Sequence, residues 1–218
     1  MITLHVEVPL ASFRKSYARS LGETYPFAPP ATVYGMLLSL VGERIRARHQ
    51  GVKLAFAYAR KPRVTTTLRS LSRYKYGIAS KQAAYGNIPD YVESLCGIDF
   101  LCWVDSDSEQ SRGKARTLEA RLIEAIASPE TIHRSGVLAL GLSDDAVNEI
   151  SLVDRVEGSW HWLTPCNNGL IELPIWVDHV GARNTRWQRY HFDTTPSTSA
   201  EKPNHEKFVT IFDPTARI

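Results

Sequence analysis

The sequence lacks several features that would place a protein in a common class. No stretch of about 18 uncharged apolar residues occurs in its 218 residues, which excludes a membrane-spanning helix and indicates no membrane partner. None of its three cysteines, Cys96, Cys102 and Cys166, forms a C-x-x-C pair, so we expect reduced thiols in a cytoplasmic protein. The seven histidines never lie four residues apart, so no metal site is predicted.

Motifs of the common enzyme classes are absent as well. The sequence contains no Gly-rich phosphate loop, no G-x-S-x-G and no motif of paired carboxylates, so no cofactor is expected. Its first eight residues lack the cationic start and the long apolar run of a signal peptide. His133, His179 or His191 could serve as the general base of a metal-independent ribonuclease, which is the alternative to a purely binding role. Single histidines are more often structural, so the sequence favours a non-catalytic protein.

Positive charge is concentrated in the first 90 residues. Residues 1–90 carry 14 Lys and Arg against 4 Asp and Glu, whereas residues 91–218 carry 12 against 19, so the net charge of +3 is the sum of +10 and −7. Such a concentration favours an anionic partner, with an uneven solvated surface as the alternative.

Hydrophobic periodicity predicts alternating strands and helices in the first part of the chain. Strands are expected over residues 2–8, 52–68 with an interruption at Pro62, 98–104 and 136–142. A helix is expected to start at Pro30 and to end in a basic turn formed by Arg44, Arg46 and Arg48, and a second helix is expected over 118–126. Two glycines inside the first helix, Gly35 and Gly42, predict close contact between that helix and the sheet.

This order, β-α-β-β-α-β, is typical of a ferredoxin-like α+β unit, in which four antiparallel strands carry both helices on one face. RNA-recognition domains share the layout. We therefore predict a ferredoxin-like RNA-binding domain over residues 1–143, with an insertion at about 69–89, and a small, mainly β domain over residues 144–218.

Three clusters that mix basic and aromatic residues are candidates for binding RNA. Cations hold phosphates and aromatic faces stack on unpaired bases, at about 1 to 3 kcal/mol per base. The alternatives are a solvated hairpin for the insertion, solvent-facing lysines for the loop after the first strand, and a core tryptophan in the last cluster. The candidate residues are Arg69, Arg73, Lys75, Tyr76 and Lys81 in the insertion, Ser12, Arg14, Lys15 and Arg19 in the loop, and Arg183, Arg186 and Trp187 in the last cluster.

Residues 23–42, ETYPFAPPATVYGMLLSLVG, closely resemble the signature of the CRISPR-associated Cas-five family, whose members are subunits of the type I Cascade surveillance complex. The opening VPLASFR of residues 8–14, residues 138–141 and residues 170–186 also resemble that family. Family members commonly have a third proline where Ala28 stands and a serine where Ala31 stands. The missing serine removes a helix-start hydrogen bond of about 1 kcal/mol.

The resemblance implies a ferredoxin-like domain, a protruding thumb between its second and third strands, and a smaller β domain. It also implies that the protein caps the guide RNA by holding its 5′ handle, and that it contacts the backbone and large subunits of Cascade and, indirectly, target DNA. One branch of the family cleaves precursor guide RNA with a Tyr, Lys and His set. That set does not map onto this sequence, which favours binding alone.

Overall fold

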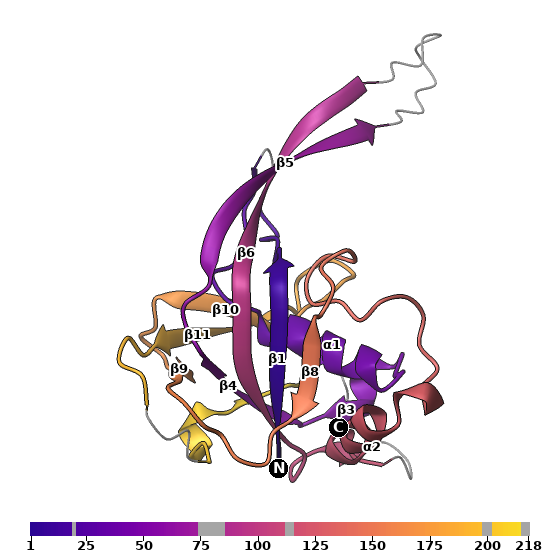
Figure 1. Ribbon diagram of the computed structural model, residues 1–218, viewed down its shortest axis with the longest axis vertical. Helices are drawn as coiled ribbons and strands as arrows, with labels where there is room; N and C mark the ends of the chain where they lie inside the picture. Colours follow the sequence, from indigo (N-terminus) through magenta and orange to yellow (C-terminus); the bar gives the residue numbers. More distant parts are fainter. Residues whose placement is uncertain (19–20, 74–85, 112–115, 198–201, 215–218) are drawn as a thin grey trace.

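The structure is a computed structural model that describes residues 1–18, 21–73, 86–111, 116–197 and 202–214. It is built mostly of antiparallel sheet, with few helices. A body carries one long β-hairpin arm that projects away from it (Figure 1).

Secondary-structure elements follow the chain from β1 to β12. They are β1 (Ile2–Ala11), β2 (Leu21–Gly22), α1 (Pro30–Leu40), η1 (Arg46–Arg48), β3 (His49–Gln50), β4 (Lys53–Tyr58), β5 (Arg63–Arg73), β6 (Gly86–Asp105), β7 (Gln110–Ser111), α2 (Leu118–Ala127), η2 (Pro129–Thr131), β8 (Glu149–Leu152), β9 (His161–Pro165), β10 (Ile171–Trp176), β11 (Arg186–Phe192), η3 (His205–Lys207) and β12 (Val209–Thr210).

One sheet of ten strands organises the described residues, in the order β10-β11-β9-β4-β6-β1-β8. Strand β12 pairs with β4, and strands β2 and β5 pair with β6. The alternation predicted for residues 2–8 is confirmed, because Leu4, Val6 and Val8 are fully buried while the residues between them are partly exposed. They pair antiparallel with β6 on one side, and Leu4 and Val6 also pair with β8 on the other.

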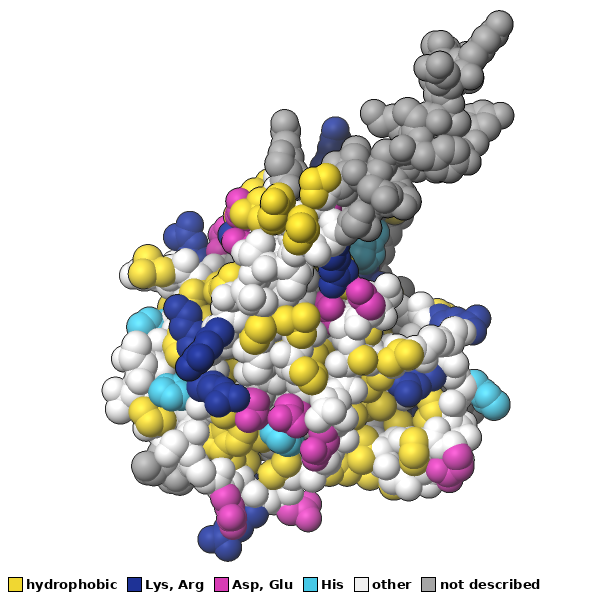
Figure 2. Space-filling model, turned by 45° about the horizontal axis from the view of Figure 1, so that its top comes forward, with side chains coloured by type: hydrophobic (Ala, Val, Ile, Leu, Met, Phe, Trp, Pro, Cys, Tyr) yellow, Lys and Arg dark blue, Asp and Glu magenta, His cyan; other side chains and the backbone are white. Residues whose placement is uncertain are grey.

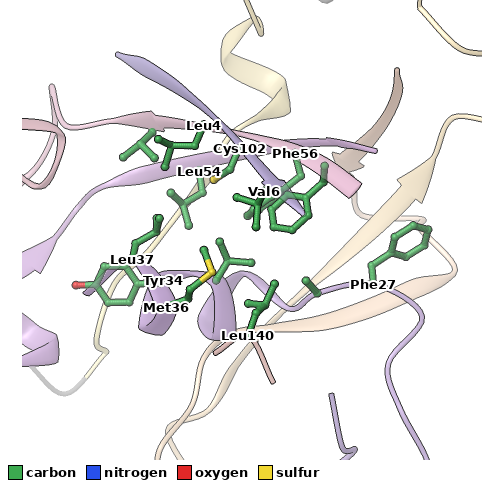
Figure 3. Packing of buried hydrophobic residues seen from close by; sticks show 14 of the residues in the cluster. Leu4, Val6, Phe27, Tyr34, Met36, Leu37, Leu54, Phe56, Cys102 and Leu140 are labelled. Carbon is green, nitrogen blue, oxygen red and sulfur yellow. The ribbon is translucent and has the colours of Figure 1, made fainter. Parts of the chain in front are cut away.

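Both helices pack on the same face of this sheet. Leu4, Val6 and Phe56 from the strands face Met36 and Leu37 of α1 in one continuous core (Figure 3), and Leu118 and Leu122 of α2 belong to the same core. The opposite face carries a smaller apolar cluster around the stacked rings of Trp103 and Trp162.

The arm is an extension of the central strand. Strand β6 pairs with β5 up to Cys96 and with β4 from Phe100 onward, and Gly97 lies between the two partners with a φ of 65°. The predicted interruption at Pro62 is confirmed, since β4 ends at Tyr58 and β5 begins at Arg63. The insertion predicted at about 69–89 is described only at its two ends, where residues 69–73 and 86–89 continue the paired strands of the arm.

The C-terminal residues extend the same sheet across the boundary predicted between 143 and 144. Strand β8 lies beside β1, and β9 lies beside β4. Leu163, Tyr190 and Ile211 are fully buried in the core that contains α1.

The strand predicted over residues 136–142 is wrong. Its only pairing is a single bridge between Ala139 and Ala146, and the chain turns at Gly141, whose φ is 121°. Leu138 and Leu140 are buried because they cover the core, which explains an apolar run that is not a strand. Strand β8 takes the place beside β1 instead.

The end of the first helix also differs from the prediction. The helix stops at Leu40, and Gly42 follows in the left-handed region with a φ of 66°. The three arginines therefore lie beyond the last turn, and the guanidinium of Arg46 lies 4.3 Å from the ring centre of Trp176. The predicted close contact between the sheet and the two helix glycines is absent. A Cβ on Gly42 would meet the backbone of His133, which is not in the sheet. A Cβ on Gly35 would meet no described atom within 4 Å outside its own helix backbone.

A buried charged network joins the end of α1 to the start of α2. The Arg121 guanidinium donates to the Glu43 carboxylate at 2.6 Å and to the Nε2 atom of His49 at 2.9 Å, and the His49 Nδ1 atom lies 2.6 Å from Glu109. An arginine can only donate, so His49 Nε2 accepts and its Nδ1–H donates to the Glu109 carboxylate. Glu109 in turn accepts from the N–H of Leu118, the first residue of α2.

The pKa of Glu43 reflects this network. Burial alone would raise the pKa, but hydrogen bonds from the Ile45 N–H and the Arg121 guanidinium, together with the charge of Arg48, lower it to about 2. The ordinary value is 4.5. The charge of Glu43 therefore stabilises the fold above pH 4.5, and this contribution is lost as the pH falls towards 2.

Glu43→Gln is expected to lower the free energy of unfolding at pH 7 by on the order of 3 kcal/mol, and by progressively less below pH 4.5. Urea titrations at pH 7, 4 and 2.5 would measure this, with the exposed Glu130→Gln as the matched control. A deficit in Glu43→Gln that stays constant across that range would contradict the assignment.

Candidate nucleic-acid interface

A groove of about 560 Å³ opens where four parts of the chain meet at one end of α1. We call it the arginine–tryptophan groove. Its walls come from the loop after β1, the start of α1, the turn at Gly141 and the segment between β10 and β11, and they include Arg14, Tyr25, Thr32, His179 and Trp187. Two of the three predicted clusters thus meet in one cavity, although they are far apart in the sequence.

The loop after β1 is held firmly at its start. The Ser12 N–H donates to the Asp145 carboxylate at 2.8 Å, and the Ser12 hydroxyl donates to the Glu93 carbonyl at 2.8 Å. The next N–H, that of Phe13, donates to the Thr24 hydroxyl at 2.9 Å. Ser12 is 1% exposed, so its hydroxyl positions the loop from inside the protein, whereas Arg14 is the first exposed side chain of the loop.

Two other predicted residues of this cluster have different surroundings. Lys15 is partly buried, forms an ion pair with Glu23 at 3.1 Å and lies 5.6 Å from the ring centre of Tyr17. Arg19 lies outside the described residues. Of the predicted cations in this loop that the structure describes, Arg14 is the one that lines the groove.

One wall of the groove is formed by Trp187, which is 40% exposed and therefore is not a core residue. Its ring centre lies 6.1 Å from that of Tyr25, so two aromatic rings line the same cavity. Arg183 and Arg186 are exposed near this wall, one in the preceding loop and one in β11 beside the tryptophan. An exposed ring flanked by cations is an arrangement suited to stacking on an unpaired base.

Asp178 shapes the loop that leads to Trp187. Its carboxylate accepts hydrogen bonds from the N–H of Val180 at 2.9 Å and from the N–H of Asn184 at 3.3 Å. The bond from Val180 is the main cause that lowers the pKa of Asp178 below its ordinary value. The loop is thereby closed on itself, with Ala182 in the left-handed region at a φ of 62°.

Within the described part of the chain, the arm supplies fewer candidate RNA-binding side chains than the sequence predicted. Arg69 lies on its stem and forms an ion pair with Asp144 at 3.1 Å. Arg73 ends strand β5, whereas Lys75, Tyr76 and Lys81 lie outside the described residues. The stem also carries exposed apolar side chains on adjacent strands, Leu21, Leu68 and Tyr91, whose backbones pair in register. We call these three residues the stem patch.

The space-filling view shows exposed hydrophobic side chains near the base of the arm, and Lys and Arg side chains in several separate groups (Figure 2). The charge concentrated in residues 1–90 therefore does not form one continuous basic face in that view.

The candidate histidines occupy different positions. His179 lines the arginine–tryptophan groove, His133 lines another cavity, near Gly42, and His191 is exposed on β11 at 3.8 Å from Asp193. Among the described residues, no group of three His, Cys, Asp or Glu side chains is arranged to hold a metal ion. No helix in the described ranges is both long enough and apolar enough to cross a membrane.

Sequence reasoning missed several residues that build the groove. Tyr25 and Thr32 belong to the segment with the family signature, but neither was predicted to contact RNA. Gly141 was assigned to a strand, yet its position is decisive: a Cβ there would lie 2.9 Å from the Ser12 carbonyl and 2.7 Å from the Asp145 carboxylate. A glycine at the end of an apolar run was the available signal, and only the structure shows what it approaches.

Comparisons with known proteins agree with one another. The family model described as CRISPR-associated protein (Cas_Cas5) matches residues 1–140. CRISPR-associated protein Cas5 from Myxococcus xanthus (strain DK1622) is 36% identical over 190 residues, which cover 86% of this chain and 88% of that protein.

Solved structures give the same fold at low sequence identity. A chain of a CRISPR RNA-guided surveillance complex matches with a TM-score of 0.59 at 15% identity, over 94% of this chain and 95% of its own length. A crystal structure of a Cas protein matches with a TM-score of 0.51 at 15% identity, over 89% and 94%.

Gly141→Ala is expected to lower the free energy of unfolding more than Gly136→Ala does. Both positions have positive φ, which costs an alanine about 1 to 2 kcal/mol, but only the Cβ at position 141 would also collide with Ser12 and Asp145. Thermal or urea unfolding of the two variants measures the difference. Equal destabilisation would show that the turn at Gly141 does not support the groove in the way described.

Proposed function

Because this chain belongs to the CRISPR-associated Cas5 family, we propose that it is a non-catalytic Cascade subunit that binds the 5′ handle of a CRISPR guide RNA. The observation that carries the proposal is the arginine–tryptophan groove, in which an exposed arginine and an exposed tryptophan line one cavity. A solved structural relative belongs to an RNA-guided surveillance complex, which supports an RNA ligand and a multi-subunit setting.

A single-stranded ligand fits the groove better than a duplex does. Trp187 and Tyr25 present aromatic rings within one cavity, and stacking on an aromatic ring requires a base that is not stacked in a helix. Arg14 and the exposed Arg183 and Arg186 supply charge for the phosphates on both sides of such a base. A repeat-derived handle of unpaired nucleotides has this chemistry.

The core of the fold supports a ferredoxin-like assignment. The order β4-β6-β1-β8 places the first strand of the unit between the third and the fourth, with antiparallel neighbours and both helices on one face. The arm connects the second and third strands of this unit, so it occupies the position of a thumb. The assignment of residues 1–143 and 144–218 to two domains remains part of the proposal.

Contacts with other Cascade subunits are proposed for the arm. The stem patch exposes between 38% and 63% of each of its three residues, which lie on β2 and on the two strands, β5 and β6, of the projecting hairpin (Figure 1). Exposed apolar patches of this kind support protein contacts. The backbone subunit and the large subunit are the proposed partners, and target DNA would be reached through them.

The alternative function is cleavage of precursor guide RNA without a metal. His179 is the residue that favours it, because it lines the same groove as Arg14 and Tyr25. General acid–base catalysis would need a proton donor or acceptor within hydrogen-bond reach of the scissile phosphate.

Loss of the groove's charge or of its exposed ring is expected to weaken binding of handle RNA. Arg14→Gln should make the negative slope of log affinity against log salt shallower by about 0.7, because one phosphate contact is lost. Trp187→Ala should cost about 1 to 3 kcal/mol of binding free energy. Fluorescence anisotropy over a salt series measures both. Phe212→Ala, which removes another exposed ring, is the matched control, and equal binding by all three variants and the wild type would refute the proposed site.

Purified protein incubated with labelled precursor repeat RNA in EDTA is expected to leave the RNA intact. Discrete products on a denaturing gel would refute the non-catalytic role. Their disappearance in His179→Ala would then assign cleavage to the groove, whereas products that persist in that variant would assign it elsewhere.

A further inference from the structure

We infer that the bound single strand continues from the arginine–tryptophan groove along the outer side of helix α1, towards Arg44 and Arg134. This inference rests on the proposed function, and it adds a second binding segment that the sequence-based candidates did not include. Three observations support the inference: a row of adjoining cavities along α1, a glycine inside that helix, and two arginines at the far end of the row.

The groove does not end at the start of α1. A second cavity of about 340 Å³ shares Thr32, Gly141, Val177 and His179 with the arginine–tryptophan groove. A third cavity, of about 330 Å³, shares Gly35, Ser39 and Arg46 with the second. The three cavities therefore adjoin one another along α1, and we call this row of cavities the α1 channel.

Helix α1 lines the channel with the small residues Ala31, Thr32, Gly35 and Ser39, together with Met36 and Leu38. Val33, Tyr34 and Leu37 point into the core, whereas Gly35 and Ser39 line the channel. A glycine inside a helix is unfavourable relative to alanine. No described atom lies within 4 Å of a Cβ placed on Gly35, so packing within the protein does not explain the glycine. An outside ligand that approaches the helix backbone closely would explain it.

The charges along the α1 channel suit a phosphate backbone. Arg44 and Arg134 line its far end, are exposed, and have no hydrogen-bond or ion-pair partner among the described residues. The acidic residue there, Glu43, is neutralised by Arg48 and Arg121. At the other end, the carboxylate of Asp178 is occupied by the N–H groups of its own loop. Asp178 keeps its negative charge, but the lining of the α1 channel is net positive, because four arginines line it against two carboxylates: Arg14, Arg44, Arg46 and Arg134 against Glu43 and Asp178.

The length of helix α1 sets how many nucleotides the α1 channel can hold. Helix α1 has 11 residues and is thus about 16 Å long, which corresponds to about five nucleotides at the 3.4 Å spacing of a stacked strand. A short RNA would occupy the arginine–tryptophan groove alone, and a longer one would fill the α1 channel as well.

The test compares labelled oligouridines of 4 and 12 nucleotides by anisotropy over a salt series. The double variant Arg44→Gln/Arg134→Gln is expected to make the negative slope of log affinity against log salt shallower by about 1.4 for the 12-mer, since two phosphate contacts at about 0.7 each are lost. Its binding of the 4-mer is expected to match that of the wild type. Arg155→Gln, an exposed arginine beside the cluster on the opposite sheet face, is the matched control and should match wild type with both RNAs.

A second variant fills the channel without changing its charge. Gly35→Leu is expected to weaken binding of the 12-mer but not of the 4-mer, and its melting temperature should be no lower than wild type, because leucine is the better helix former and has open space there. Binding of the 12-mer that is unchanged in both channel variants would overturn the inference.

The outcomes also separate this inference from the proposed function. If Arg14→Gln weakens the binding of both RNAs while the channel variants bind them as the control does, the proposed function stands and the α1 channel does not bind RNA. If the wild type binds neither RNA, or if Arg14→Gln and Trp187→Ala both bind the 4-mer as the wild type does, the proposed function and this inference are both overturned.

Discussion

The pairing of strand β6 is the constraint on which the rest of the structure depends. Strand β6 has 20 residues and belongs to both the body and the arm. In the body it lies between β4 and β1, and in the arm it pairs with β5. The change of partner occurs around Gly97, in the left-handed region, opposite Pro9, which has no N–H to contribute to the ladder. The arm is therefore a continuation of the core sheet rather than an appended loop, and its stem is fixed relative to the groove.

The groove follows from how loops leave this sheet. Strand β1 ends at Ala11, and hydrogen bonds from the next two residues immediately fasten the loop to Glu93, Thr24 and Asp145. The same carboxylate of Asp145 also accepts from the N–H of Leu142, so one buried group holds two walls. The cavity is thus lined by a chain whose backbone is secured from within, while exposed side chains such as Trp187 face outwards. Such preorganisation reduces the ordering cost of binding.

Strong periodic signals in the sequence predicted most of the body. The alternation of residues 2–8 and the apolar stripe of α2 arise because each element buries one face, which sequence spacing reports directly. Residues 150–153 were predicted as a short run of the C-terminal β region, which strand β8 confirms, but its place beside β1 was not predicted. The strand is short and only partly buried, while the stronger apolar run before it covers the core without pairing. The end of α1 was misplaced because the basic residues after it resemble a helix terminus, whereas Gly42 ends the helix.

The candidate site was predictable only in part. Arg14 and Trp187 were found because basic and aromatic residues cluster locally around each of them. Their meeting in one cavity, and the role of Gly141 in allowing it, depend on tertiary contacts that no local pattern encodes. The network of Glu43, His49, Glu109 and Arg121 was missed for the same reason, because it joins segments that are distant in the sequence. Spacing cannot reveal a buried ion pair of this kind.

The central claim is that a single RNA strand occupies one end of the body, across the arginine–tryptophan groove and the outer side of α1. Photocrosslinking of the full chain to an oligonucleotide that contains 4-thiouridine, followed by mass spectrometry of the crosslinked peptides, tests it most directly. The account predicts crosslinks in peptides from residues 12–18, 31–46 and 177–190. Crosslinks confined to residues 153–160 and 205–208, which lie beside the cluster on the opposite face of the sheet, would contradict it.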